Sequence, residues 1–339
     1  MKIGFLGVHN IICGISEHLR YSLYYGLTKE ERKNSIVFAG NYGERIRPDE
    51  DFVRRCWYRD NFYEFLNYTI KENPVDIINI QHEYGLQNTE FLVKAIKKLQ
   101  QMGIKVVTTF HTSSHGEDMS TNPIYNVSDW SIVHTESIGD RLTSIPVPFL
   151  DFDIDHLANR VKFDSNYKTK GKFLIGHFGF PYSHKGHKEI IDAVKDIPNA
   201  VLVFLFSQRK ELNANVPCIK DYADQVGCPN IIIHKFFEIE KVIELLSACD
   251  VAIFNHPKDT PGNSGAIRIG MGAKIPIITS PAGVIKDALP LLNVSEPENF
   301  KDELIKAKGS KIRYLDYINN NSWKTMMNQY KEIFERLVV

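Results

Sequence analysis

The sequence predicts an α/β protein made of two Rossmann-like domains, each with a doubly wound parallel sheet. Short apolar runs alternate with helical patterns along nearly the whole chain, and this repetition is typical of strand–helix–strand units. The runs are almost solidly apolar, as expected of parallel strands that are buried on both faces. The chain has 339 residues. Single hydrophobic cores stop growing at roughly 250–300 residues, so this length favours two domains.

The apolar runs form two series, one in each half of the chain. The first series covers residues 3–8, 35–39, 75–80, 104–110 and 131–133. The second series covers residues 173–178, 200–206, 231–234, 251–254 and 275–279. Helical patterns between them include residues 17–25, 90–101, 187–195 and 238–248. We therefore expect a parallel sheet in each half.

A break near residues 145–172 separates the two series. Pro146 and Pro148 cannot continue a helix, and residues 159–172 are polar and charged. We expect an N-terminal domain over residues 1–155 and a second domain over residues 156–320. The remaining residues, 321–339, carry apolar side chains at helical spacing and predict a packed amphipathic helix.

Composition excludes some classes of protein. Lys+Arg and Asp+Glu both number 41, so the chain has no net charge with which to collect nucleic acid, although a local patch stays open. The five cysteines form no CxxC pair and indicate reduced thiols in a cytoplasmic protein. No segment approaches the ~20 apolar residues of a membrane span.

An arginine- and aromatic-rich segment, residues 44–68, allows several interpretations. Acidic residues balance its arginines, so a helix that packs its aromatic side chains into the core is the preferred one. Contact with nucleic acid, by stacking on the aromatic side chains, is an alternative.

Polar and glycine residues follow many of the predicted strands. In the first half these include Gly14, the pair His82 and Glu83, and His111. In the second half they include Gly179, Lys185, Ser264 and Gly265. Ligands bind outside the carboxyl ends of parallel strands, so residues from both halves predict a cleft between two domains.

The content of these loops favours a phosphate-bearing ligand. Glycines at helix starts permit close backbone approach, and helix N-termini attract anions. Lys185, beside Gly186 at the head of a helix, is a suitable point charge for a diphosphate. The sequence has no Walker loop and no GxGxxG fingerprint, which disfavours a simple kinase, ATPase or NAD dehydrogenase.

At these residues the sequence resembles glycosyltransferase family 4, whose members are retaining enzymes with the GT-B fold. The similar stretches, in the same order as in the family, are residues 75–86, 106–112, 179–186 and 264–278, and the final helix from Ser322 and Trp323. The resemblance covers nearly the whole chain. It implies two domains facing a cleft, with the C-terminal helix crossing back onto the N-terminal domain.

The resemblance also implies catalytic and donor-binding roles. It places His111 at the donor sugar and Lys185 at the leaving diphosphate, with Gly14 and Gly179 near that diphosphate. Ser264 and Gly265 offer backbone N–H groups at a helix start. Arg268 either faces the diphosphate or is a surface residue.

Further contacts follow from the same resemblance. It implies, as an alternative to core packing, that residues 44–68 meet the acceptor or a membrane surface. Base and ribose contacts are expected from the loop that contains Phe237 and from the helix that begins near Ser264. His82 and Glu83 are expected on the acceptor side, or in purely structural roles. No metal is expected, because no Asp-x-Asp pair follows a strand, and no cofactor is expected besides a UDP- or GDP-linked sugar as substrate.

The chain departs from the family pattern at two places. Phe180 stands where many members have an arginine, and Pro261 and Ile269 stand where the two donor-site glutamates are commonest. The sequence thus predicts a divergent branch that lacks the Glu-x7-Glu signature.

The expected function is a metal-independent glycosyl transfer, with retention of configuration, from a nucleotide sugar to a saccharide, a lipid-linked sugar or another small acceptor. One alternative is transfer to a macromolecule, either a protein or a modified DNA base. The other is a catalytically silent GT-B protein that binds a nucleotide or sugar or acts as a scaffold. The expected location is cytoplasmic, with peripheral membrane contact left open.

Overall fold

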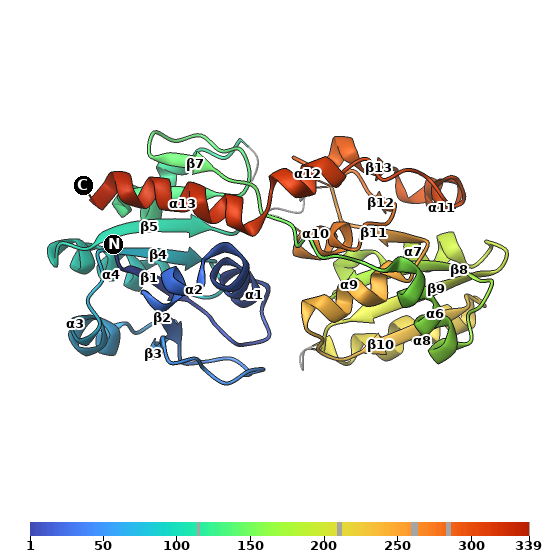
Figure 1. Cartoon of the computed structure of the whole chain (residues 1–339), viewed down its shortest axis with the longest axis horizontal. Coiled ribbons are helices and arrows are strands. Elements are labelled where there is room, and N and C mark those ends of the chain that lie inside the picture. Colours follow the sequence, from blue (N-terminus) through green and yellow to red (C-terminus); the bar gives the residue numbers. More distant parts are fainter. Residues whose placement is uncertain (114–115, 209–211, 259–263, 283–285, 339) are drawn as a thin grey trace. The chain divides into compact units, whose positions relative to one another are not determined.

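The chain forms two compact α/β units. The computed structural model describes residues 1–338 except 114–115, 209–211, 259–263 and 283–285 (Figure 1). The first unit contains the described residues within Met1–Val147 and Asn321–Val339, and the second those within Pro148–Thr260 and Ser264–Asn320. The predicted pair of parallel-sheet α/β domains is confirmed. Among the described residues, no helix combines the length and the apolar composition that crossing a bilayer requires.

The sheet of the first unit has the order β3-β2-β1-β4-β5-β6-β7 among the described residues, and all of these neighbours pair in parallel. Its strands are β1 (Ile3–Gly7), β2 (Ser35–Gly40), β3 (Val53–Trp57), β4 (Ile77–His82), β5 (Lys105–Phe110), β6 (Trp130–Val133) and β7 (Leu142–Ser144). Its helical segments are α1 (Gly14–Tyr21), η1 (Ser22–Gly26), α2 (Lys29–Lys33), η2 (Phe65–Thr69), α3 (Ile70–Glu72), α4 (Thr89–Gln101), η3 (Met119–Thr121), α5 (Pro123–Val127) and α13 (Trp323–Val338).

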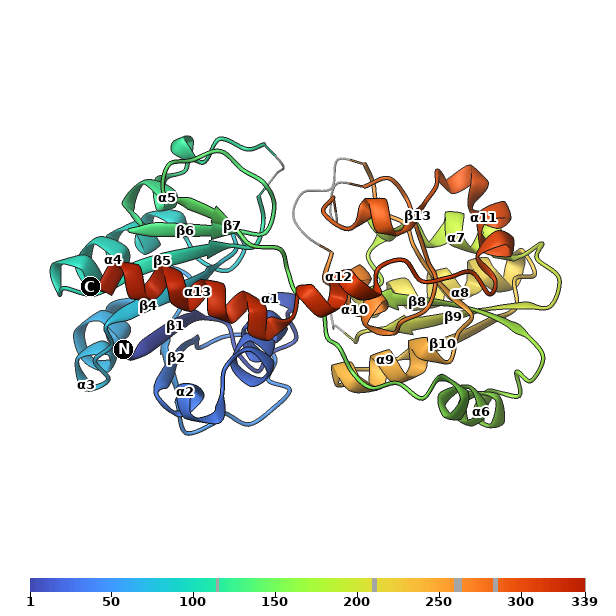
Figure 2. The ribbon, with the colours of Figure 1, turned by 45° about the horizontal axis from the view of Figure 1, so that its top comes forward.

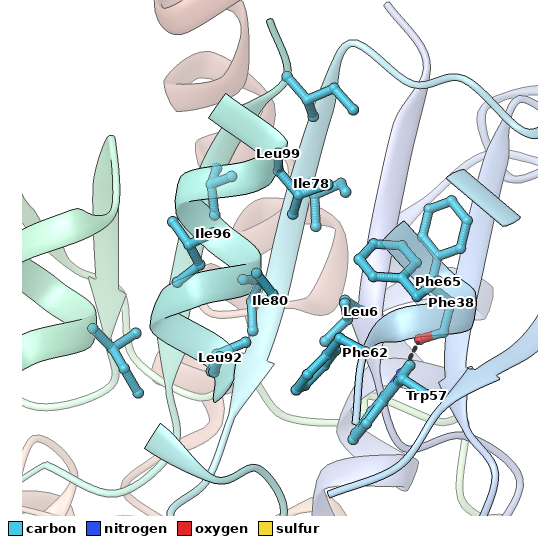
Figure 3. Close-up of a cluster of buried hydrophobic side chains, with 14 of the residues drawn as sticks. Leu6, Phe38, Trp57, Phe62, Phe65, Ile78, Ile80, Leu92, Ile96 and Leu99 are labelled. Atoms are coloured by element: carbon cyan, nitrogen blue, oxygen red, sulfur yellow. Dashed lines mark hydrogen bonds between the residues drawn. The ribbon is translucent and has the colours of Figure 1, made fainter. Parts of the chain in front are cut away.

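One face of this sheet carries the apolar cluster shown in Figure 3. Alternate side chains of a strand point to one face, so Ile78 and Ile80 of β4 both reach this cluster. Helix α4 covers it with the apolar stripe of Leu92, Ile96 and Leu99. In the same layer the indole nitrogen of Trp57 donates to the carbonyl oxygen of Phe38 at 2.9 Å, which satisfies its buried N–H.

The arginine- and aromatic-rich segment is only partly as expected. Its aromatic residues Trp57, Phe62 and Phe65 are buried in the core, as predicted. The predicted helix is wrong over Val53–Trp57, which pairs with β2 as an edge strand. The guanidinium of Arg55 lies 2.7 Å from Asp49, so this arginine is held by a local ion pair.

The opposite face of the sheet is covered by α1, η1 and the C-terminal helix α13. Thr109 on β5 donates its hydroxyl to the hydroxyl of Tyr330 at 3.4 Å, and the Trp323 ring lies 4.9 Å from the ring of His18. The C-terminal helix therefore belongs to the first unit, as predicted, and Figures 1 and 2 both show it in red along the unit that holds the N-terminus.

The sheet of the second unit has the order β10-β9-β8-β11-β12-β13 in the described part of the chain, again with parallel neighbours. Its strands are β8 (Phe173–Gly179), β9 (Ala200–Phe206), β10 (Asn230–His234), β11 (Val251–Phe254), β12 (Ile277–Thr279) and β13 (Asn293–Val294). Its helical segments are α6 (His156–Tyr167), η4 (Ser183–Lys185), α7 (His187–Val194), α8 (Asn215–Gln225), α9 (Ile239–Ser247), α10 (Gly265–Gly272), η7 (Leu289–Leu291), η8 (Pro297–Asn299), α11 (Phe300–Ala307) and α12 (Leu315–Asn320).

Helix α6 begins in the polar segment that the sequence predicts as a break. The side chain of Asp155 caps it by accepting from the backbone N–H of Ala158 at 2.9 Å. Phe163 is buried, and Arg160 bridges Asp164 and Asp250 at 3.1 and 3.0 Å. Charge pairs thus hold a polar helix on the second unit, and the change of unit lies earlier, between Val147 and Pro148.

The packing of α13 predicts a large effect for Gly26→Ala. A Cβ at this buried residue lies 3.0 Å from the carbonyl oxygen of Trp323 and closer still to the side chain of Met327. We expect a loss of about 1–3 kcal/mol in the free energy of unfolding, as for other overpacked sites. Urea unfolding followed by tryptophan fluorescence measures it, because all three tryptophans lie in the first unit.

Gly85→Ala is the matched control, because a Cβ there meets no described atom within 4 Å. It should change the unfolding free energy by no more than about 0.5 kcal/mol. Equal effects of the two variants would contradict the packing described for α13.

Candidate functional site

Lys185 lies at the carboxyl edge of the second sheet, in the loop between β8 and α7. Its side chain is half-buried, and its Nζ lies 2.7 Å from Nε2 of His256. Burial lowers the pKa of Lys185 to about 8. The residue expected at the leaving diphosphate is therefore a cation that pays a desolvation cost and gains from any anion brought to it.

His256, which follows β11, holds Lys185 in place. Burial, with the charge of Lys185 next, lowers the pKa of His256 to about 2, so its ring is neutral and Nε2 accepts from the ammonium group. The same Nε2 lies 3.2 Å from Oγ of Ser264, the residue that caps α10 by accepting from the N–H of Ile267 at 3.4 Å. His256 thus connects the lysine to the start of α10. Sequence reasoning missed it as a site residue, although its position directly after a strand was the available signal.

Two of the predicted donor-site glycines begin helices. At each of them, the space that a side chain would fill is open. Gly265 is the first residue of α10 and Gly14 the first residue of α1, and both are exposed. A Cβ at either position meets no described atom within 4 Å, so packing inside the described chain does not require glycine there. The unpaired N–H groups of both helix starts are left approachable for an anion.

Gly179 ends β8 beside the first turn of α10. A Cβ built on it lies 3.8 Å from Cβ of Ala266. The structure therefore brings Gly179, Lys185, Ser264 and Gly265 to one edge of the second sheet. This edge also has a cavity of about 320 Å³. The cavity is lined by Ser183, His184, Gly186, Glu189, Asn255, His256, Pro257, Lys258, Ser280, Pro281, Glu296 and Pro297.

Arg268 is tied into the second unit. It is 2% exposed, its guanidinium lies 2.6 Å from Oδ1 of Asp287, and it stacks 4.9 Å from the ring centre of Phe149. Burial acts to raise the pKa of Asp287, but the charge and hydrogen bond of Arg268 outweigh it and lower this pKa. The alternative that Arg268 is a surface residue is therefore wrong. The ion pair gives Arg268 a structural function, and its expected contact with a diphosphate stays a prediction.

The other expected donor-site positions lie further from this edge or outside the described residues. Phe237 is half-buried after the edge strand β10, with Nζ of Lys235 4.6 Å from its ring centre. Its contact with a base stays a prediction. Ile269, at the second signature position, is half-buried on α10, and Pro261, at the first, lies outside the described residues.

In the first unit, a chain of side-chain amides fixes His111 at the end of β5. Asn79 donates to the carbonyl oxygen of Val107 at 3.2 Å, which leaves its Oδ1 to accept from Nε2 of Gln81. Oε1 of Gln81 then accepts from Nε2 of His111, 2.8 Å away. Burial first, and then the neighbouring histidines His18, His134 and His82, lower the pKa of His111 well below its usual value.

His82 and Glu83, predicted on the acceptor side, differ in exposure. His82 is 1% exposed, and its Nδ1 donates to Oε1 of Gln87 at 3.1 Å, which is a core arrangement. Glu83 is half-buried and accepts from the hydroxyl of Thr112 at 2.5 Å. Glu83 thus stands next to His111 along the sheet edge, whereas His82 supports the core beneath it.

Comparison with solved structures shows the fold. Anabaena Alr3699/HepE, solved in complex with UDP-glucose, is 14% identical over 99% of this chain and 99% of that chain, with a TM-score of 0.66. A glycosyltransferase from Rickettsia africae ESF-5 is 14% identical over 99% and 98%, with a TM-score of 0.73. An α,α-trehalose-phosphate synthase (UDP-forming) from Burkholderia vietnamiensis is 11% identical over 100% and 99%, with a TM-score of 0.67.

These full-length matches show that the chain has the GT-B fold, as the sequence predicts. At such low identity they establish the fold and not the activity. No protein-family model matches the chain, and neither does any curated protein.

The loop that carries Lys185 predicts a strong effect for Gly186→Ala. Gly186 has φ +57°, and a Cβ on it lies 2.6 Å from Cγ of Asn255. Gly227, at φ +73°, has no described atom within 4 Å of such a Cβ, so Gly227→Ala carries only the backbone strain of about 1–2 kcal/mol. Gly186→Ala should reduce the unfolding free energy by more than this, because Asn255 must also move.

Chemical denaturation of both variants, followed by far-UV circular dichroism, makes the comparison. A cost for Gly186→Ala equal to that of Gly227→Ala would mean that Asn255 does not confine the loop.

Proposed function

We propose that this chain is a glycosyltransferase that resembles family 4 and moves a sugar from a UDP- or GDP-linked donor to a saccharide, lipid-linked or other small acceptor. The proposed transfer retains the anomeric configuration and needs no metal. The second unit binds the nucleotide part of the donor, and the first unit contributes the acceptor side.

One observation carries this proposal: a half-buried lysine with a lowered pKa is held by a neutral histidine, which also contacts the residue that caps helix α10. Lys185 and the N–H groups of α10 both attract an anion to the same edge of the sheet. In the contacts described above, neither Lys185 nor the N–H groups at the start of α10 are paired with a carboxylate. A leaving nucleoside diphosphate fits such a site, and the UDP-glucose held by one structural neighbour supports this choice.

The proposed chemistry makes one main demand on the protein. As the bond between the anomeric carbon and the diphosphate oxygen breaks, negative charge builds up on the leaving phosphate. Lys185 and the helix start at Gly265 stabilise that charge without a metal ion. The leaving phosphate then helps to take the proton of the acceptor hydroxyl, so no protein nucleophile is required.

In the first unit, His111 is the proposed contact to the donor sugar and Gly14 a further backbone contact to its diphosphate. Glu83 is the acceptor-side candidate, since it is half-buried at the end of β4. The interior position of His82 favours a structural role for that residue.

The second candidate function is a GT-B protein that binds a nucleotide without turning it over. Ile269 favours it, because this residue replaces a glutamate that is common in family 4. Binding is shared by both candidates, so turnover alone separates them.

A thermal-shift screen tests donor binding. The untagged chain is heated with UDP, GDP, ADP, dTDP or CMP, and with their common sugar conjugates, in EDTA. We expect one nucleotide to raise the apparent stability, by about 2.7 kcal/mol at a hundredfold excess over Kd. Lys185→Met should weaken binding by roughly tenfold to a hundredfold, which corresponds to about 1.5–3 kcal/mol for a charged hydrogen bond.

Lys188→Met is the control, because Lys188 lies on α7 with its Nζ 5.1 Å from the ring centre of Tyr222. Its affinity for the nucleotide should match that of the unmodified chain. No shift with any nucleotide, or equal losses in the two lysine variants, would argue against the proposed donor site.

The lowered pKa of Lys185 predicts how nucleotide affinity changes with pH. Only the ammonium form attracts a diphosphate, and in the free protein this form is lost as pH rises through about 8. The affinity should therefore fall by about tenfold per pH unit above 8. Isothermal titration from pH 7 to 9.5 measures this.

Lys185→Arg keeps its charge over this range and should remove the dependence on pH. A pH profile of the unmodified chain that coincides with that of Lys185→Met would mean that Lys185 does not contact the diphosphate.

The open helix starts give a further prediction. Gly265→Ala and Gly14→Ala should each leave the fold intact or stabilise it by up to about 1 kcal/mol, because alanine is the better helix former. Each should nevertheless weaken nucleotide binding, because the added methyl group occupies the space through which a phosphate approaches the N–H groups. Denaturation and titration of the same samples separate the two effects, and unchanged affinity in both variants would count against backbone binding of the diphosphate.

A further inference from the structure

Three buried histidines meet inside the first unit, outside the groups assigned to the leaving diphosphate. His18 lies on α1, His111 directly after β5 and His134 directly after β6, and they are 7%, 9% and 3% exposed. Their ring centres are 4.6 Å apart for His18 and His111, 5.1 Å for His18 and His134, and 5.2 Å for His111 and His134. One ring nitrogen from each lies within 4.8 Å of the other two. We call these three residues the histidine cluster.

The hydrogen bonds around the histidine cluster fix which nitrogen of two rings carries the proton. Nε2 of His111 donates to the amide oxygen of Gln81, whose orientation is set by its own bond to Asn79, so the lone pair of His111 is on Nδ1. Nδ1 of His134 donates to the carbonyl oxygen of Ile145 at 2.9 Å, so its lone pair is on Nε2. A histidine that donates one N–H to an amide or carbonyl oxygen has the arrangement that metal-ligating histidines almost always have.

His18 supplies the second observation. Neither Nδ1 nor Nε2 of this buried ring makes a hydrogen bond of regular geometry among the described residues, although the side chain of Gln81 lies within reach of the ring. A buried polar atom without a partner is costly and calls for a reason, such as a bound ion or water. The ring of His18 lies between the other two histidines and Trp323, and its centre is 4.9 Å from that of the Trp323 ring.

We propose that the histidine cluster binds one divalent transition-metal ion, with Zn²⁺ as the expected ion. Three neutral imidazoles and no carboxylate form a donor set that suits zinc and not calcium or magnesium. Zinc–nitrogen bonds of about 2.0–2.1 Å in tetrahedral geometry space the ligand nitrogens by ~3.3 Å and the ring centres by ~5.2 Å. Two of the three ring-centre distances match this spacing, and the third, 4.6 Å between His18 and His111, is shorter, so the rings must shift to bring their nitrogens to one ion. Three protein ligands leave one position for water.

This inference goes beyond the proposed sugar transfer, which uses no metal, but it shares one residue with that function. A zinc ion bound by His111 occupies the residue proposed to contact the donor sugar, so zinc stabilises the first unit and competes with the donor sugar for His111. The sequence has no recognisable metal motif here, because the three ligands come from separate elements with no regular spacing.

Zinc binding by the untagged full chain tests the proposal. The protein is treated with EDTA, exchanged into metal-free buffer and titrated with ZnCl₂ against a fluorescent chelator. We expect one equivalent to bind and the melting temperature to rise with it. X-ray absorption at the zinc edge of the loaded protein should show imidazole nitrogens at about 2.0–2.1 Å.

His18→Gln and His134→Gln should each weaken zinc binding by at least tenfold. His187→Gln is the matched control, because His187 is also buried with an unpartnered Nε2 but lies in the second unit. Circular dichroism verifies that each variant is folded. The X-ray absorption spectrum is recorded on the unmodified chain, so it tests the ligands even if a variant fails to fold. Absence of stoichiometric binding, sulfur ligands in the spectrum, or unchanged affinity in the two cluster variants would overturn the proposal.

Discussion

Parallel pairing is the constraint on which the rest of this structure depends. Each described strand pair in both sheets is parallel, so every strand delivers its following loop to the same edge. The loop after β8 and the residue after β11 therefore meet, although Lys185 and His256 are far apart in the sequence. In the first unit the same rule brings the side chain of Gln81, on β4, within hydrogen-bonding distance of His111, which follows β5. Each sheet, within its own unit, thus brings together polar groups that no local sequence feature connects.

Burial gives these edges their chemical character. Lys185 is partly desolvated and is bonded to a neutral ring, so its charge has no local counter-ion in the contacts described here. An anion brought to this lysine restores part of what the lysine lost on leaving water, and this is the physical basis of the proposed diphosphate site. Arg268 shows the opposite case. Its charge is matched by Asp287 inside the unit, so it stabilises the fold around α10.

The sequence was a good guide where burial alone determines structure. Solid apolar runs such as residues 173–178 and 200–206 became β8 and β9, and the apolar stripe of the last helix became the face that packs on the first sheet. The strand β3 was missed because Arg54 and Arg55 interrupt its apolar character at a sheet edge, and β13 because it has only two residues.

The candidate site was predicted less completely, for a physical reason. Lys185, Ser264 and Gly265 could be selected because each follows or opens an element. The partners that define their chemistry come from tertiary packing: His256 beside Lys185, and Asp287 beside Arg268. The histidine cluster has the same origin, because α1 and two separate strands must be packed before its rings can meet.

The central claim is that the chain breaks the bond between a sugar and a nucleoside diphosphate. Proton NMR of the purified chain with individual nucleotide sugars, in EDTA and with water as the fallback acceptor, tests it most directly. The account predicts slow release of free nucleotide from one donor, with the sugar first appearing in the anomeric form of the donor, and loss of that release in Lys185→Met. Nucleotide binding without any release, even with a panel of saccharide acceptors, would contradict it and identify the chain as a GT-B protein that binds its ligand without catalysis.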